Sequence, residues 1–528
     1  MNMKLRVLSV LLIFVMLFAA CGRANTTDSE KAPDTTADNN TSNVDGESSN
    51  DVDNGEDSVL KDGNQTELIM IYPGNSSHPA SLEEIENSMN SIIKDKVDAT
   101  IKLKIFEWGV YTDQLNLILS SGENADIAFT FTSSINYANN GQIQPITQLV
   151  QGYAPEAYKL FEQYIDACMV NGELYGLPTF HEYTSKSGLV CRKDILDETG
   201  IDVSTIKTWD DIENVLKKVR EIYPEMNLLT NAEQSRGTLQ YYNQGIFDII
   251  QADSGMGIYL DDDPNDGIEV VSIYSTPEYM ELANKAYDWN KKGYFIPDAT
   301  TISETRQDLI RAGNTFGYIG MIHPGTVTQE TRNSGKEMVA IPVTGSGLTT
   351  GNVNFAQYMI PIASKNPEKA LAFLNELYTN EDMQNLFMYG IEGEDYVVKD
   401  EEKGVAGYPE GKDGTSVGWS NEPWLSGNAS ISYAWETDPP TIWEDYLEFN
   451  ASATVSPLFG FVFDIENVKN EISAVTNVIT KYCAVIEAGY ADPNESVTAL
   501  NKELESAGIQ KIIDEAQRQV DEWLANKN

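Results

Sequence analysis

Cysteine and histidine are scarce in this chain of 528 residues, and their scarcity excludes several kinds of site. Four cysteines occur, and apart from Cys21 they are far apart, at Cys168, Cys191 and Cys483. No Cys-x-x-Cys pair is present, so neither a zinc site nor a disulfide framework is indicated, although the sequence allows one pair among the last three. The 3 histidines are isolated from one another, which argues against a histidine-rich metal centre. We expect buried thiols, no metal and no cofactor.

Catalytic signatures are also missing. The sequence contains no His-Glu-x-x-His metalloprotease motif, no Gly-x-Ser-x-Gly nucleophile elbow and no Walker phosphate loop. No distinctive pair of glycosidase carboxylates stands out among the 81 acidic residues, so a secreted glycoside hydrolase is only an alternative to a binding protein. The acidic run 261–267 contains Pro264 and lacks the later Glu of an EF-hand, so we interpret it as a solvated turn. The sequence therefore favours a non-enzymatic protein.

Basic residues are few as well. The chain has 36 Lys and Arg against 81 Asp and Glu, which gives a formal net charge of −45. A chain this acidic repels phosphate backbones, so nucleic acid is not an expected partner, and a polyanionic substrate is disfavoured. Because 41% of the residues are hydrophobic, the chain can still form sizeable cores, and its length suggests two or three domains.

Long hydrophobic runs are absent except near the N-terminus, where residues 8–18 are mostly apolar and follow Lys4 and Arg6. This run is shorter than the roughly 20 residues that a membrane-spanning helix needs, so we interpret residues 1–21 as a secretory signal. Two alanines precede Cys21, an arrangement similar to the bacterial lipobox, in which this cysteine is lipidated. Phe18 departs from that motif because Leu usually stands there. An ordinary cleaved signal is the alternative.

The remainder divides into a spacer and a folded body. Residues 22–65 consist almost entirely of Asp, Asn, Ser, Thr, Glu and Gly, which predicts a disordered acidic linker. From Thr66 on, strands and helices alternate: 68–72, 101–106 and 125–129 are predicted strands, with helices over 81–97 and 111–120 between them. Ser81 with Glu84 suggests a capping box. This alternation predicts an α/β fold with a parallel sheet.

The pattern continues in a second block. We expect strands at 188–192, 317–322 and 338–342, and an extended run over 355–363. Thr208 is the expected N-cap of a helix over 209–222. Further helices are predicted over 237–247, 276–292, 366–379 and 509–523, with the chain mostly helical after Val468.

Several segments together resemble the extracellular solute-binding lipoproteins of ABC importers, in particular the large Gram-positive type associated with oligosaccharides. The residues that carry the resemblance are Phe106–Trp108, Gln114–Asn116, Ser121–Ile127, Asn171–Gly172, Tyr175–Pro178, Arg192–Leu196 and Thr208–Asp211. The end of the chain is similar to an uncharacterised C-terminal domain found on a subset of these proteins, through Ser456–Asp464, Ala507–Ile509 and Trp523.

This resemblance implies a periplasmic-binding-protein-like α/β fold of two lobes, with a hinge and a ligand cleft between them. It implies lobe 1 from 66–180 plus 322–365, lobe 2 from 181–321 plus 366–455, and a helical region over 456–528 packed on the lobes. It further implies a monomeric receptor, anchored by lipid at Cys21 on the extracellular face of the membrane, that delivers its ligand to the permease subunits of an importer. The expected ligand is a neutral sugar or oligosaccharide, and a peptide or another solute is the alternative.

Candidate ligand-binding residues follow from the rule that ligands bind outside the carboxyl ends of the strands in such sheets. Aromatic rings suit the C–H faces of sugars, and polar side chains suit the hydroxyls. The tryptophans of the irregular stretch 419–443 could line the site or staple the domain, and Trp108 could equally be a core residue. For His323 a structural role is the alternative. The candidates are Asn75, Trp108, Thr132, Thr179, His181, Tyr183, Tyr241, His323, Trp424 and Trp435.

Overall fold

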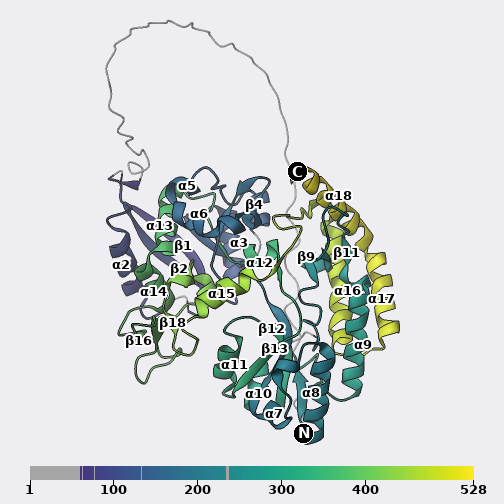
Figure 1. Cartoon of the computed structure of the whole chain (residues 1–528). Helices are drawn as coiled ribbons and strands as arrows, with labels where there is room; N and C mark the ends of the chain where they lie inside the picture. The colour runs from purple at the N-terminus through teal and green to yellow at the C-terminus, as the bar shows by residue number, and fades with distance from the viewer. Residues whose placement is uncertain (1–59, 62, 77, 132–133, 234–236, 528) are drawn as a thin grey trace, which may run out of the picture. The chain divides into compact units, whose positions relative to one another are not determined.

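The computed structural model describes residues 60–61, 63–76, 78–131, 134–233 and 237–527 (Figure 1). Cys21 and nearly all of the expected linker lie outside these residues. In the described ranges, no helix has both the length and the apolar composition needed to cross a membrane. Nor do the described side chains include three or more His, Cys, Asp or Glu grouped as a metal ion would need.

Lobe 1 is built on a five-stranded sheet in the order β2-β1-β3-β15-β6. The first three of these strands run parallel, whereas β15 runs antiparallel to β3 and to β6. The edge strand alternates as its sequence predicts, with Ile101, Leu103 and Ile105 buried against the core and Lys102 exposed. The strands are β1 (Thr66–Gly74), β2 (Ala99–Glu107), β3 (Ile127–Thr130), β6 (Gly176–Pro178) and β15 (Gln357–Met359).

Helices cover both faces of this sheet. The α2 helix (Leu82–Ile93) buries Ile85, Met89 and Ile93 at intervals of four residues, as an amphipathic helix does. The expected capping box is wrong, because the Ser81 hydroxyl donates to Asp395 (3.2 Å) in place of the helix N-terminus. The other helices of this lobe are α3 (Tyr111–Ser121), α4 (Ile135–Asn139), α5 (Val150–Tyr153), α6 (Pro155–Phe161), α12 (Thr350–Asn354), α13 (Pro367–Thr379), α14 (Glu381–Tyr389) and α15 (Ile442–Ala451).

Lobe 2 has a four-stranded sheet in the order β13-β7-β12-β8, in which β12 runs parallel to β8 and antiparallel to β7. Its strands are β7 (Lys186–Arg192), β8 (Asn227–Thr230), β12 (Thr315–Ile322) and β13 (Met338–Pro342). Its helices are α7 (Lys193–Glu198), α8 (Trp209–Ile222), α9 (Pro277–Lys291), α10 (Arg306–Arg311) and α11 (Thr326–Ser334).

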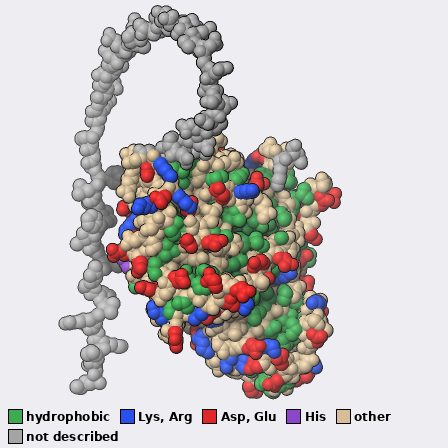
Figure 2. Space-filling model, turned by 60° about the vertical axis from the view of Figure 1, so that its left-hand side comes forward, with side chains coloured by type: hydrophobic (Ala, Val, Ile, Leu, Met, Phe, Trp, Pro, Cys, Tyr) green, Lys and Arg blue, Asp and Glu red, His purple; other side chains and the backbone are tan. Residues whose placement is uncertain are grey.

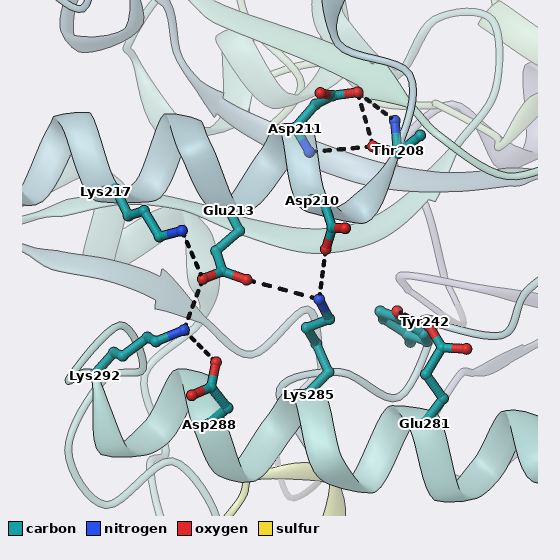
Figure 3. Close-up of polar contacts among 10 residues, drawn as sticks. All are labelled: Thr208, Asp210, Asp211, Glu213, Lys217, Tyr242, Glu281, Lys285, Asp288 and Lys292. Carbon is teal, nitrogen blue, oxygen red and sulfur yellow. Dashed lines mark hydrogen bonds and ion pairs between the residues drawn. The ribbon is translucent and has the colours of Figure 1, made fainter.

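An ion-pair network joins α8 to α9 (Figure 3). Glu213, 8% exposed, accepts from Lys292 at 2.7 Å and lies 3.2 Å from Lys217 and 3.7 Å from Lys285. At the start of α8, the predicted cap of Thr208 is confirmed: its hydroxyl accepts from the Asp211 N–H, and the Asp211 carboxylate accepts from the Thr208 N–H. These contacts fix two neighbouring helices of lobe 2 relative to each other.

The helix expected over 237–247 is wrong. Residues 238–246 form successive turns, and β9 (Phe247–Gln251) follows them in a three-stranded antiparallel sheet with β10 (Met256–Tyr259) and β11 (Val271–Ser272). Gly245 has a φ of +80°, and a Cβ at this position would lie 2.4 Å from the Gly345 carbonyl oxygen. The close approach of a distant backbone therefore overrides the local helical pattern.

The C-terminal helices are α16 (Lys469–Glu487), α17 (Pro493–Ala507) and α18 (Ile509–Lys527). Their apolar faces share one buried core with lobe 2, in which Val475, Leu500 and Ile512 lie with Leu282 and Ala286 of α9. In Figure 1, α16 and α17 run beside α9. The helical region is therefore a structural part of lobe 2.

The buried cores divide the chain differently from the expected boundaries. Residues 322–342 contain the end of β12, α11 and β13, which belong to the sheet of lobe 2 and its helices, not to lobe 1. Residues 367–443 lie in the core of lobe 1, not in lobe 2. This stretch includes three short strands, β16 (Val397–Asp400), β17 (Val405–Gly407) and β18 (Ala434–Trp435).

Three segments cross between the lobes side by side. The first crossing lies between β6 and β7, the second between β13 and α12, and the third between α15 and α16. The Thr184 hydroxyl donates to the Gly347 carbonyl (2.8 Å), which links the first crossing to the second. The second and third crossings pair as β14 (Gly347–Leu348) and β19 (Thr454–Val455). Two strands of two residues each are thin enough to act as a hinge between two large cores.

Candidate functional site

Four aromatic side chains gather at the carboxyl edge of the lobe 1 sheet. Trp108 lies 5.9 Å from Phe131 and 5.5 Å from Trp424, measured between ring centroids, and Trp424 lies 5.8 Å from Phe355. Phe355 is 45% exposed, and the other three are half-buried. We call Trp108, Phe131, Phe355 and Trp424 the aromatic platform.

The strand register explains why these rings meet. Trp108 directly follows β2 and Phe131 directly follows β3, both at carboxyl ends. Because β15 is antiparallel and Gln357 pairs with Thr130, the start of β15 brings Phe355 to the same edge. Trp424 comes from a 3-10 turn, Pro423–Leu425. The Thr179 hydroxyl holds that turn by donating to the Trp424 carbonyl (2.7 Å).

Polar side chains from the crossings and from both lobes lie near one another. Glu182, on the first crossing, has an oxygen 3.7 Å from Nε2 of His323, which directly follows β12. Tyr446 of α15 neighbours Glu182, and so does Glu422, two residues before Trp424. The side chains of Glu182 and His323 are 27% and 21% exposed, so solvent and ligands can reach them.

The pKa values of Glu422 and Tyr446 follow from the burial and the charges around them. Loss of solvent contact raises the pKa of Glu422, an effect that Arg332 opposes and Glu182 reinforces. The residue as a whole nevertheless keeps exposed surface, so a ligand can reach its carboxyl. Burial and the nearby Glu182 and Asp438 raise the pKa of Tyr446 well above its usual value, so its hydroxyl stays protonated.

Helix α11 of lobe 2 contacts lobe 1 beside this group. The Thr328 hydroxyl donates to Asp438 (2.5 Å), and Arg332 donates to the Thr437 hydroxyl (3.0 Å). We call the side chains of Glu182, His323, Glu422 and Tyr446 the polar group. It lies where the two lobes approach each other, next to a direct contact between them.

Three predicted residues have structural partners in the first crossing. Thr179 is fully buried, and Tyr183 is 1% exposed with its hydroxyl donating to the Thr179 carbonyl (2.9 Å). His181 is 6% exposed, its Nδ1 lies 2.9 Å from the Thr179 carbonyl oxygen, and burial lowers its pKa, so it stays neutral. We assign these three residues to the support of the crossing, because their side chains are satisfied within the protein.

The other predicted residues are spread out. Asn75 lines an open pocket at the end of β1, the strand beside the one that Trp108 follows. Tyr241 lies in lobe 2, where its hydroxyl bonds Glu233. Trp435 packs on Tyr389 and Tyr408, with ring centroids 5.1 and 4.7 Å apart. Thr132 lies outside the described residues.

The residues predicted from the sequence do not include Phe355, Glu422, Arg332 or Tyr446. Phe355 stands at the start of the extended run over 355–363, but its place at the sheet edge depends on β15 running antiparallel. Tyr446 belongs to a helix that contacts Gly325 at the start of α11, a contact between residues more than a hundred positions apart. Sequence pattern carries no signal for such contacts.

The arrangement suits the binding of a polar ligand that also has apolar faces. Aromatic rings can stack against such faces, and the carboxylate, phenol and imidazole groups can bond hydroxyls. Acidic side chains outnumber basic ones on the face shown in Figure 2, as the net charge requires.

Comparison with known families gives two matches. Residues 80–384 match the profile of the bacterial extracellular solute-binding protein family, which is more than half of the chain. Residues 457–525 match a domain of unknown function, DUF3502, and this range covers the C-terminal helices.

Two known proteins resemble the chain, one over most of its length and one over about a third of it. A carbohydrate ABC transporter substrate-binding protein of Streptococcus pneumoniae is 29% identical over 490 residues, 92% of this chain and 95% of that protein. An arabinooligosaccharide-binding protein of Bacillus subtilis is 27% identical over 35% of this chain and 42% of its own length.

Among solved structures, the N-glycan transport solute binding protein NgtS of S. pneumoniae superposes with a TM-score of 0.78 at 28% identity, covering 88% of this chain and 100% of that one. NgtS in complex with Man1GlcNAc gives a TM-score of 0.69 at 27% identity, with the same coverage. NgtS in complex with Man5GlcNAc gives 0.66 at 27% identity, covering 88% of this chain and 99% of that one.

Proposed function

We propose, from the premise that this chain belongs to the family of bacterial extracellular solute-binding proteins, that it captures a neutral oligosaccharide for an ABC importer. Proteins of this family bind solutes outside the cell and are not enzymes. The observation that carries the carbohydrate proposal is the aromatic platform at the carboxyl edge of the lobe 1 sheet. The carbohydrate-binding relative, which aligns with 92% of the chain, supports it.

The proposed ligand lies between the platform and the polar group of Glu182, His323, Glu422 and Tyr446. One face of a sugar ring stacks on the indoles of Trp108 and Trp424, and its hydroxyls bond the polar group. Closure of the hinge brings His323 of lobe 2 towards a ligand that lies on the lobe 1 side chains. The carboxylates Glu182 and Glu422 disfavour an anionic sugar, so the ligand is neutral.

The proposed partners are the permease subunits of an importer, which the two lobes contact after closure. The proposed anchor is a lipid on Cys21, which holds the protein on the extracellular face of the membrane. Mass spectrometry of the protein purified from its membrane tests this: a diacylated N-terminal Cys21 is expected, and an unmodified one would contradict it.

Binding is tested on the mature chain from residue 21 onward. Thermal unfolding is measured with neutral oligosaccharides of manno-, arabino- and gluco- type, including Man1GlcNAc and Man5GlcNAc, and with peptides. A ligand that binds only the folded state stabilises it by about 2.7 kcal/mol at a hundredfold excess over its Kd. We expect a rise in melting temperature with one neutral series and no sugar product by chromatography.

The variant Trp424→Ala is expected to weaken that binding at least about tenfold, because a tenfold loss takes only about 1.4 kcal/mol, within the range of one stacked aromatic side chain. Trp435→Ala is the matched control: it removes another half-buried tryptophan of the same stretch, away from the platform, and should leave affinity unchanged. A response to peptides alone would replace carbohydrate as the ligand, and turnover of a sugar would contradict a binding role.

A further inference from the structure

A concave space lies at the same edge of the lobe 1 sheet as the aromatic platform. It has a volume of about 220 Å³ and sits at the carboxyl ends of β1 and β2. Tyr72, Gly74 and Ile105 contribute from the strands, and the loop Gly414–Asn421 forms the opposite wall. We call this space the β1 pocket. It can hold one additional sugar ring beyond a ring stacked on the platform.

The β1 pocket and the platform are formed at the ends of neighbouring strands. Gly74 pairs with Glu107, so the next residues, Asn75 in the pocket and Trp108 in the platform, leave adjacent strands together. Neighbouring strands are about 4.8 Å apart, so the two strand ends are close enough to contact adjacent units of one glycan. The loop that ends at Asn421 continues within three residues to Trp424 of the platform. One chain segment therefore lines both spaces.

The wall of the β1 pocket is fixed before any ligand arrives. Asp395 accepts from the Gly418 N–H (2.7 Å) and from the Ser81 hydroxyl (3.2 Å), which ties the loop to the start of α2. The packing is tight enough that a Cβ on Gly418 would lie 2.2 Å from the Ser81 hydroxyl oxygen. Trp419 is 4% exposed and donates to the Phe387 carbonyl (2.8 Å). Preformed pockets of this kind bind without the cost of ordering a loop.

The lining has the chemistry of a sugar subsite. Tyr72 and Trp419, 1% and 4% exposed, support the pocket from within the core, with ring centroids 6.4 Å apart. Amide and hydroxyl groups come from Asn75, Asn421 and Ser420. His78 also lines the pocket, but among the described lining residues there is no Asp, Glu, Lys or Arg, so an uncharged ligand group is favoured there.

We propose that the β1 pocket is a second sugar subsite, which takes a neighbouring or branching unit of the oligosaccharide whose first ring stacks on the platform. This proposal rests on the proposed function and deepens it. The protein then prefers longer glycans, because a short ligand fills only the platform.

The test fills the pocket and compares ligands of two lengths. Ser420→Trp places a large side chain at an exposed lining position, and Ser506→Trp, on the exposed face of α17, is the control for an added tryptophan. Kd is measured by calorimetry for Man1GlcNAc and Man5GlcNAc, or for the shortest and longest members of whichever neutral series binds. Melting temperatures of both variants confirm that they fold.

The expected result is that Ser420→Trp weakens the long glycan at least tenfold and the short one less than twofold, while Ser506→Trp changes neither. Asn75→Leu, which removes an amide without filling the pocket, should also weaken only the long glycan. Equal effects on both lengths, or none, would overturn the subsite while leaving the proposed function standing. Failure of the unaltered protein to bind any neutral oligosaccharide would overturn the proposed function itself.

Discussion

The tryptophans of the stretch 419–443 have different roles, and the extent of their burial distinguishes those roles. Trp419 and Trp443 are 4% and 9% exposed, and their indole N–H groups donate to the carbonyls of Phe387 and Ser432. A buried indole that is bonded in this way stabilises the fold. Trp424, by contrast, is half-buried among rings that reach the surface. Sequence could identify the stretch, but not which of its tryptophans would be accessible.

Gln384 of α14 gives a prediction about stability. Its side chain is fully buried, and among the described residues neither of its amide atoms has a hydrogen-bond partner. Replacing a buried, unsatisfied amide by an apolar side chain of similar length removes a cost of about 1 to 3 kcal/mol. We therefore expect Gln384→Met to raise the free energy of unfolding by about 1 kcal/mol, measured by urea denaturation.

The neighbouring Asn385 is the control for this prediction. Its side-chain oxygen accepts from the Tyr433 N–H (3.0 Å), so Asn385→Leu should destabilise the protein by leaving that donor unsatisfied. If Gln384→Met lowers stability as Asn385→Leu does, Gln384 has a bonding role and the prediction is wrong.

At the scale of elements, the contact between α8 and α9 predicts a dependence of stability on pH. Although burial acts to raise the pKa of Glu213, hydrogen bonds from Lys292 and Lys217 lower it to about 2 (Figure 3). A carboxyl whose folded-state pKa lies below its unfolded value of 4.5 stabilises the fold above that pH and loses this contribution as pH falls towards 2. The contribution is on the order of 2 kcal/mol at neutral pH.

The variant Glu213→Gln should therefore be less stable than the unaltered protein at pH 7, and the difference should shrink between pH 5 and pH 2. Urea unfolding at several pH values measures this. Glu503→Gln is the control, because Glu503 pairs with Lys481 on an exposed surface, where ion pairs contribute little. A Glu213→Gln deficit that stays constant with pH would mean that lost packing, not lost charge, destabilises the variant.

Elements with strong local signals were predictable. The strands at 338–342 and the capped helix from Trp209 agree with the structure, because their patterns and their surroundings favour the same conformation. The turns at 238–246 were missed because a contact with residue 345 decides their conformation. The edge that carries the platform was predicted from strand order, yet Phe355 required knowledge of an antiparallel pairing.

At the scale of the whole molecule, the two cores predict how the protein unfolds. Cys168 lies in the core of lobe 1, whereas Cys191 and Cys483 lie in the core that lobe 2 shares with the C-terminal helices. Burial raises the pKa of Cys168 to about 12, so its thiol does not react until its lobe opens. We expect Cys191 and Cys483 to become reactive together in rising urea.

Pulsed thiol alkylation followed by mass spectrometry measures this. A transition for Cys168 distinct from that of the other two would show that the lobes unfold separately, as two cores joined by thin crossings should. Labelling of Cys483 at much lower urea than Cys191 would contradict a shared core and make the C-terminal helices an independent domain.

The two-lobed architecture followed from the family resemblance, but the lobe boundaries did not. The expected division exchanged residues 322–342 and 367–443 between the lobes. Those segments have ordinary α/β patterns, and nothing in a strand's own sequence indicates which of two sheets it joins. The pairing of β12 and β13 with β7 places residues 322–342 in lobe 2, and the buried core of lobe 1 places residues 367–443 there.

The discontinuous cores also govern when this chain can fold during its synthesis. The lobe 1 core combines residues from Leu68 to Trp443, and the lobe 2 core combines residues from Leu189 to Val520. Neither can close until most of the polypeptide has left the ribosome, and contacts so distant in sequence form slowly. A nascent chain that stays unfolded for this long can still pass through a translocation channel as an extended polypeptide, as a secreted protein must.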